Sequence, residues 1–152
     1  ECKKGGDCSL ESSLRELAMY RMERAFEMLI AAEDNLKIGQ YKTSLNRSYY
    51  AIFHAMRAAN IIKGFDSSKH SGVIAFFNKE YLKENIIDRK MSPIIKNSSF
   101  FREKSDYDDF FIASKKDAEN QLKNAKIFLS VVEDYLKTEN HNLLANPQIS
   151  RH

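Results

Sequence analysis

Two side chains with complementary chemistry, Arg47 and His54, stand seven residues apart in a run of good helix-forming residues. On an α-helix this spacing returns to nearly the same face, about 10.5 Å further along the axis. A neutral histidine can accept a proton, and an arginine can stabilise negative charge on a phosphate. We therefore predict that Arg47 and His54 form the catalytic pair of a site that acts on a phosphate group.

The helix that carries this pair is expected over residues 42–63. Its apolar stripe consists of Leu45, Tyr49, Ile52, Met56 and Ala59. At about 100° per residue, Arg47 and His54 lie roughly 160 to 200° from this stripe, so we expect them to face away from the core. The outward face also contains Tyr50, Ala51, Ala55 and Ala58, whose size would let another helix approach closely. We expect a seam between two copies of the chain here, and a two-fold axis would gather two arginines and two histidines in one cleft.

Such a cleft suits the cleavage of RNA. One neutral histidine can take the proton of the ribose 2′-hydroxyl, and a second can protonate the leaving oxygen. An arginine can stabilise the charge that develops on the pentacoordinate phosphate. Because the attacking group belongs to the substrate, the expected product is a 2′,3′-cyclic phosphate. These steps require no metal ligands, and we predict neither a metal site nor another cofactor.

Length and composition predict one small helical domain. The chain has 152 residues, of which 43% are hydrophobic and 30% charged, and its net charge of +3 is compatible with a nucleic-acid partner without requiring one. Cys2 and Cys8 lie in a polar opening without enough nearby cysteine or histidine for a zinc site. No secretory signal or apolar run of membrane-spanning length is present. We therefore expect a cytoplasmic protein with reduced thiols and no membrane association.

The hydrophobic spacing predicts an all-α fold, an up-and-down bundle of four to five helices within residues 11–137. Flexible tails are expected at residues 1–10 and 138–152. The first helix is expected over residues 14–38 and antiparallel to the second, because the connection at Gly39 is short. A third is expected to follow cap residues 66–68 and reach about residue 83. Pro93 is expected to open a short fourth helix before a loop at 105–109, and Ser114 to begin a capping box before the last helix.

Seven further residues are candidates for supporting the site or binding RNA: Asn46, Ser48, Tyr50, His70, Arg102, Asp106 and Tyr107. His70 lies near a helix N-terminus, where anions bind, and a capping or packing role is an equal alternative. Arg102 and Asp106 could buttress the cleft, and a salt bridge that fixes a loop is the alternative. The phenylalanine pairs at 76–77, 100–101 and 110–111 are expected in the core rather than on a base-stacking surface.

The stretch Asn46-Arg47-Ser48-Tyr49-Tyr50-Ala51-Ile52-Phe53-His54-Ala55 resembles the motif helix of HEPN domains, in which four to six residues separate the arginine from the histidine. Lys69-His70-Ser71-Gly72-Val73, and Arg102 with residues 106–109, resemble the small prokaryotic HEPN proteins, and the similarity covers residues 14–136. The resemblance implies a helical bundle that dimerises through the motif helices, and a metal-independent ribonuclease that acts as a toxin.

The same resemblance implies a protein partner, a minimal nucleotidyltransferase that serves as antitoxin and in some systems modifies a tyrosine near the active site. This chain has Met56 two positions after the histidine, where the toxin subgroup has that tyrosine. It has Ser48 after the arginine, where many active members have Asn, Asp or His. Two other functions stay open: an inactive HEPN module that docks a nucleotidyltransferase or a nucleotide, and a helical interaction protein in which Arg47 and His54 only complete the dimer seam.

Overall fold

The computed structural model describes residues 5–145 of the chain, with side chains from residue 10 to residue 139. Within that range it contains five α-helices and no strand: α1 (Gly5–Lys37), α2 (Tyr41–Ile62), α3 (His70–Phe77), α4 (Met91–Tyr107) and α5 (Lys115–Ala145). A short π-helical segment, η1 (Asn78–Leu82), continues α3. The predicted all-α class is confirmed. None of the helices between residues 5 and 145 combines the length and the hydropathy of a membrane span.

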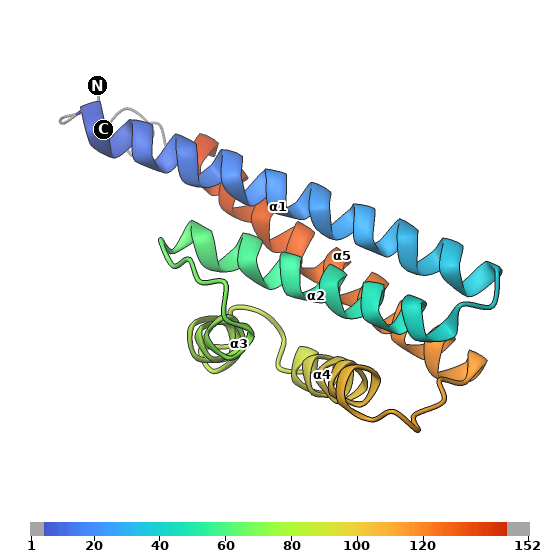
Figure 1. The fold of residues 1–152 in the computed structure, drawn as a ribbon. Helices are drawn as coiled ribbons and strands as arrows, with labels where there is room; N and C mark the ends of the chain where they lie inside the picture. Colours follow the sequence, from blue (N-terminus) through green and yellow to red (C-terminus); the bar gives the residue numbers. More distant parts are fainter. Residues whose placement is uncertain (1–4, 146–152) are drawn as a thin grey trace.

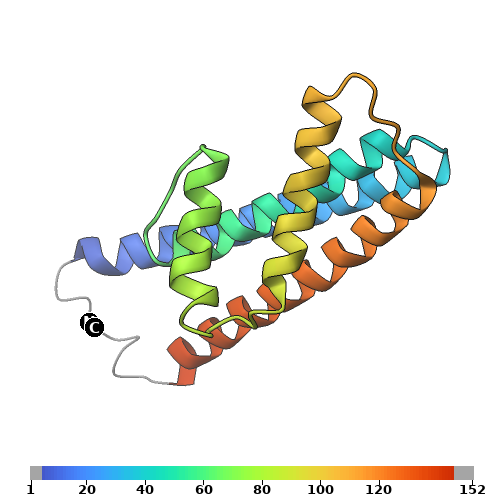
Figure 2. The same cartoon turned by 90° about the horizontal axis from the view of Figure 1, so that it is seen from below.

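The three long helices α1, α2 and α5 lie side by side, and α3 and α4 cross them on the side of α2 (Figures 1 and 2). The predicted antiparallel pairing of α1 with α2 is confirmed. It depends on a tight connection in which Gly39 has a φ of 80°, a left-handed conformation that glycine adopts without a steric penalty. The two shorter helices, α3 and α4, run across the long ones instead of continuing an up-and-down arrangement (Figure 1).

α2 is the central helix, because it packs against each of the other four. Its buried side chains cover most of its circumference: Ser44, Leu45, Ser48, Tyr49, Ala51, Ile52, Phe53, Ala55, Met56, Ala58, Ala59, Asn60 and Ile61. Buried polar groups need partners. Ser44 Oγ donates to the Ala32 carbonyl oxygen at 2.8 Å, and Asn60 Nδ2 donates to that of Val73 at 3.1 Å. These bonds hold α1 and α3 in register against the helix that carries Arg47 and His54.

Several helix ends differ from the sequence-based expectations. Residues 5–10 and 138–145, expected in flexible tails, belong to α1 and α5, while residues 1–4 and 146–152 lie outside the described residues. The extension of α5 is reasonable because residues 138–145 contain neither Gly nor Pro. α4 continues through Tyr107, so the loop expected from residue 105 was wrong. Pairs four residues apart on a helix, Arg102 with Asp106 and Lys104 with Asp108, stand 3.6 Å apart and favour this extension.

The phenylalanine pairs divide between the core and the surface. Phe77 is fully buried, and Phe76 stacks on Phe65 with ring centroids 4.1 Å apart. By contrast, Phe100 is 54% exposed, and Phe110, in the connection between α4 and α5, is 92% exposed. The expected core position of these two residues was therefore wrong. An aromatic side chain favours burial, but the side of α4 on which Phe100 lies and the path of the segment that carries Phe110 leave both exposed.

Candidate functional site

The face of α2 that carries Arg47 and His54 is its least covered side. Arg47, Tyr50, His54 and Arg57 follow one another at spacings of three and four residues, and all are half-buried, whereas most other α2 side chains are buried. We call these four residues the α2 polar strip. On one side of the strip, Arg47 Nη1 lies 4.0 Å from Met28 Sδ of α1. On the other side, Tyr50 stands edge-on to His70 of α3, with ring centroids 5.7 Å apart.

The alanines of α2 do not form the expected seam with a second copy. Ala51, Ala55 and Ala58 have no exposed surface. They lie on the helical face of Ser44, whose hydroxyl is bonded to Ala32 of α1. Small side chains thus do permit close helix approach, but the approaching helix is α1 of the same chain. The expectation was wrong because residue spacing can indicate a close contact without identifying which helix makes it.

His54 lies in a partly desolvated, positively charged environment. Burial of its ring, followed by the charges of Arg24 and Arg57, lowers the pKa of His54 from 6.5 to about 4. The imidazole is therefore neutral at neutral pH and offers one nitrogen as a proton acceptor. A phosphate bound beside the ring would oppose the arginine charges and raise this pKa. The environment therefore links the basicity of His54 to the presence of an anion.

Arginines outnumber carboxylates around His54. Arg21 of α1 and Arg57 of α2 both pair with Asp66, at 3.1 and 2.8 Å, and hydrogen bonds from both lower the pKa of the Asp66 carboxyl. Asp66 belongs to the segment between α2 and α3, so it ties that segment to both long helices. Arg24 pairs with Glu27 at 3.0 Å on the exposed surface of α1. Together with Arg47, these groups leave an excess of positive charge that favours a phosphate.

A second histidine, His70, is held by a buried tyrosine. Tyr49 is 1% exposed, and its hydroxyl lies 2.6 Å from His70 Nδ1. Burial raises the pKa of Tyr49 to about 12, so its hydroxyl keeps its proton. Among the described side chains this hydroxyl has no other acceptor, and we therefore assign Tyr49 as the donor and Nδ1 as the acceptor. The hydrogen of a neutral His70 then resides on Nε2.

Aromatic contacts connect the two histidines. Phe53 stacks on His70 with ring centroids 4.4 Å apart and contacts His54 at 5.9 Å. Arg102 of α4 places its guanidinium 5.4 Å from the centre of the Tyr49 ring, and its Nε lies 3.6 Å from the Asp106 carboxylate. Helices α2, α3 and α4 thus contribute to one cluster. Burial and the charge of Arg102 lower the pKa of His70, which favours its neutral form.

The structure brings five of the sequence-predicted candidates together and leaves the other four outside that set. Residues in one connected set around the two histidines are Tyr50, His54, His70, Arg102 and Asp106. Arg47 lies further towards the start of α2, with half-buried Asn46 beside it. Ser48 is fully buried and does not reach the surface, whereas Tyr107 is 78% exposed at the end of α4.

Sequence reasoning missed several members of the site. Arg57 follows His54 by three residues, so helical spacing alone could have identified it. Arg21 and Arg24 come from α1, and no local signal relates them to His54 before the α1–α2 register is known. The contact of Tyr49 with His70 likewise joins two helices. Among residues 10–139, no group of three or more His, Cys, Asp or Glu side chains is arranged to hold a metal ion.

Comparisons with known proteins point to one family. The model of the HEPN domain family matches residues 18–135. A Methanocaldococcus jannaschii protein named "Putative toxin" is 32% identical over 119 residues, which cover 78% of this chain and 81% of that protein. A UPF0332 protein of Thermotoga maritima is 30% identical and covers 78% and 89% of the two chains. The crystal structure of a protein from Thermus thermophilus superposes with a TM-score of 0.65 at 20% identity, over 78% of this chain and 97% of the other. That similarity concerns the fold alone.

Proposed function

The chain belongs to the HEPN domain family, and from this premise we propose that it is a metal-independent endoribonuclease with a composite active site at a homodimer interface. The observation that carries the proposal is the α2 polar strip, in which a neutral His54 lies among arginines beside an open surface. A neutral imidazole can accept a proton, and the arginines can hold a phosphodiester. The relatives named as toxins support a toxin-like role.

In the proposed reaction, His54 takes the proton of a ribose 2′-hydroxyl. The resulting oxyanion attacks the adjacent phosphorus, the bond from phosphorus to the 5′-oxygen breaks, and a 2′,3′-cyclic phosphate forms. The leaving oxygen takes a proton from the His54 of a second copy, which the bound phosphate keeps protonated by raising its pKa. Arg47 stabilises the pentacoordinate phosphate. His70 donates a hydrogen bond from Nε2 to a phosphate oxygen.

The proposal places a second copy opposite the α2 polar strip. Because the alanine face is covered by α1, this strip is the part of α2 that stays available for such a contact. A two-fold axis beside it would bring two Arg47 and two His54 side chains together. The family resemblance extends the proposal to a minimal nucleotidyltransferase as an antitoxin partner.

An inactive HEPN module that binds a nucleotidyltransferase or a nucleotide is the alternative. The low pKa of His54 favours it, because an imidazole with a pKa of about 4 is a weak base when no phosphate is present. The two functions differ in one measurable outcome. A binding module retains its ligand without cutting RNA, whereas the nuclease produces new ends.

The test is cleavage of an end-labelled RNA by the purified protein in the presence of EDTA, with the new ends identified by mass spectrometry. We expect cyclic-phosphate ends, a loss of about a thousandfold in kcat for His54→Ala, and about a hundredfold for Arg47→Ala. Arg15→Ala, on the other side of α1, is the matched control and should cleave normally. Equal cleavage by the wild type and His54→Ala, or ends without cyclic phosphate, would exclude the enzymatic function.

Mixing wild-type and inactive protein tests the composite site. Because the proposed reaction uses the His54 of both copies, a dimer of one wild-type and one His54→Ala chain should not cleave RNA. After subunit exchange in an equal mixture, only the wild-type dimers, about a quarter of all dimers, should stay active. An activity of about half that of the same total amount of wild type, with dimers verified by sedimentation, would place the whole site within a single chain.

A further inference from the structure

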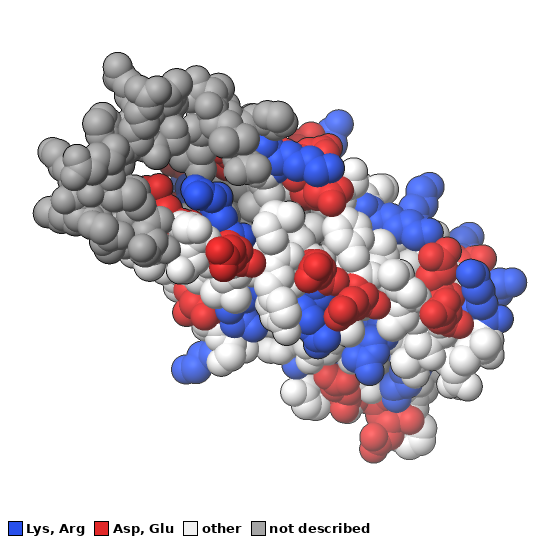
Figure 3. Space-filling view, turned by 90° about the horizontal axis from the view of Figure 1, so that it is seen from above, with Lys and Arg blue, Asp and Glu red and all other residues white. Residues whose placement is uncertain are grey.

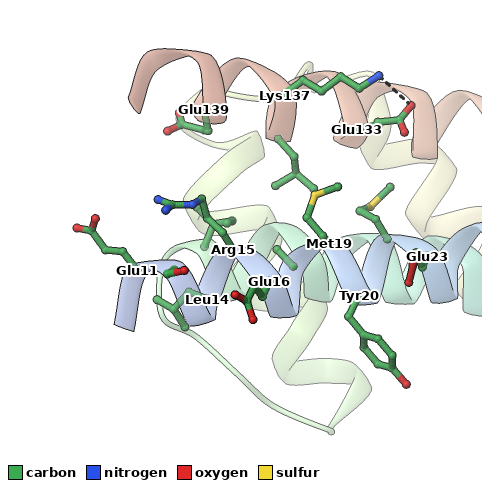
Figure 4. A pocket seen from close by; sticks show the side chains of 15 residues that line it. Glu11, Leu14, Arg15, Glu16, Met19, Tyr20, Glu23, Glu133, Lys137 and Glu139 are labelled. Atoms are coloured by element: carbon green, nitrogen blue, oxygen red, sulfur yellow. Dashed lines mark ion pairs between the residues drawn. The ribbon is translucent and has the colours of Figure 1, made fainter. Parts of the chain in front are cut away.

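A groove that takes no part in the proposed active site lies between the first half of α1 and the last part of α5. It has a volume of about 740 Å³, and Ile62 at the end of α2 lines it together with both helices. Its apolar lining includes Leu14, Met19, Met22 and Leu136. Figure 4 shows Met19 and Arg15 between the two helices, while Tyr20 points away from α5. Met19 and Tyr20 are 59% and 58% exposed, so large apolar side chains stay in contact with water along this part of α1.

The lining of the groove is acidic. Five glutamates, Glu11, Glu16, Glu23, Glu133 and Glu139, line it together with one arginine and one lysine. The lysine, Lys137, already pairs with Glu133 at 3.8 Å. Within residues 10–139, no cation lies within ion-pair distance of the other four glutamates. Figure 3 shows the molecule from above, with acidic, basic and uncharged side chains interspersed over the part that is not grey.

The local charge is opposite in sign to that of the whole chain, which is +3. Non-specific attraction would therefore draw an acidic ligand to the protein, whereas the groove itself favours a basic one. Solvent-exposed apolar surface bordered by charge is typical of protein interaction sites. α1 and α5 diverge towards this end of the molecule (Figure 2), and the groove lies between residues 11–23 of α1 and residues 133–139 of α5.

We propose that this groove docks an amphipathic helix of another protein, with an apolar face flanked by lysine and arginine. Leucine-like side chains at spacings of three and four residues would fill the space lined by Met19, Met22 and Leu136. Basic side chains along the edges would pair with Glu16, Glu23 and their acidic neighbours. Burial of the exposed Met19 side chain supplies affinity, and the glutamates supply specificity for a basic partner.

The docking groove and the proposed active site lie on different sides of α1. Met22 and Glu23 line the groove, whereas the neighbouring Arg21 and Arg24 contribute to the environment of His54. A docked helix would therefore contact the part of α1 that also carries Arg21 and Arg24, but it would not cover the α2 polar strip. The proposal is independent of RNA cleavage, and a binding experiment tests it without an activity measurement.

The probe is a synthetic amphipathic peptide of about 18 residues with leucines on one face and lysines on its flanks. A second peptide has the same leucines and glutamates in place of the lysines. Titration of the full chain, followed by fluorescence anisotropy, should give binding at least about tenfold tighter for the basic peptide. Met19→Ser and the double variant Glu16→Lys, Glu23→Lys should each weaken that binding about fivefold or more.

Two control variants change the same residue types outside the groove. Ile30→Ser replaces an exposed apolar side chain elsewhere on α1, and Glu119→Lys reverses an exposed charge near the start of α5. Both should bind the basic peptide like the wild type. Equal affinity for the two peptides, or equal weakening by the control variants, would overturn the proposal. So would sedimentation showing that Met19→Ser dissociates a dimer of this chain, because the groove would then hold a second copy.

Discussion

One side of α2 faces α1 and another faces the open surface, and these two sides differ in chemistry and in packing. The side with Ser44, Ala51, Ala55 and Ala58 is fully buried, and its polar hydroxyl is bonded to α1. The α2 polar strip is half-buried and carries Arg47, Tyr50, His54 and Arg57. Small side chains on the first side let α1 pack closely, and this contact positions Arg21 and Arg24 near His54. Packing on the buried side therefore determines which charges surround His54 on the open side.

The largest effect is expected from a change on the buried side. Ala55→Leu adds three carbon atoms at a fully buried position, and we expect a loss of about 3 kcal/mol in the free energy of unfolding. Urea unfolding measures it. The same change at exposed Ala75 of α3 is the control and should cost little. If Ala55→Leu instead left the folded monomer unchanged and weakened only dimerisation, the alanine side would be an interface between copies after all.

A smaller loss in the free energy of unfolding is expected when the pH is lowered. This loss tests the environment of His54 on the open side. The pKa of His54 is about 4 in the folded chain and about 6.5 when unfolded, so between these values the unfolded chain binds more protons. The stabilisation is fully present above pH 6.5 and is lost as the pH falls towards 4. Between pH 7 and pH 5 the expected loss is about 2 kcal/mol or less, because the ring is only half-buried.

The lowered pKa of His70 acts in the same direction, so the contribution of His54 must be isolated. Urea unfolding of His54→Asn at both pH values does this, because the variant should lose less stability on acidification than the wild type does. The Asp66 carboxyl, whose pKa is lowered from 3.8, contributes below this pH window. Equal acid sensitivity of wild type and variant would show that His54 is not held neutral by the fold.

The smallest effect is expected at Tyr49, a buried residue whose hydroxyl contacts His70. Tyr49→Phe removes only the hydroxyl that holds His70 Nδ1 at 2.6 Å. We expect a loss of about 1 kcal/mol in stability and a shift of the His70 proton from Nε2 towards a mixture of tautomers. Nitrogen-15 NMR of the imidazole measures the tautomer directly. If the proposed ribonuclease activity is present, kcat should fall about fivefold to tenfold with little change in KM.

Tyr135→Phe is the matched control for this experiment, because Tyr135 lies beside Tyr81 and away from both histidines. It should leave the His70 tautomer unchanged. An Nδ1-protonated His70 in the wild type would contradict the assignment of Tyr49 as donor. This result is independent of RNA cleavage, so the failure of one hypothesis can be distinguished from the failure of the other.

Helical periodicity was enough to predict the all-α class, the antiparallel α1–α2 pair and the placement of Arg47 and His54 on one helical face. The residues around the motif also indicated the HEPN family, which the comparisons confirm. These features are local, because the period of 3.6 residues and the capping and turn residues act within a few positions of the chain. The extent of α4 was underestimated where charged pairs, rather than apolar residues, continue the helix, and that of α5 where residues 138–145 lack Gly and Pro.

Tertiary structure decided what covers each side of α2. Ala51 and Ala55 indicated close helix approach, but only the folded chain identified α1 as the approaching helix. Only the fold brought Arg24 to His54 and His70 to Tyr49, since these residues are separated in sequence and joined by packing. Amino-acid spacing determines which side chains share a face. The packing of distant segments determines what that face meets, and hence the pKa of His54 and the tautomer of His70.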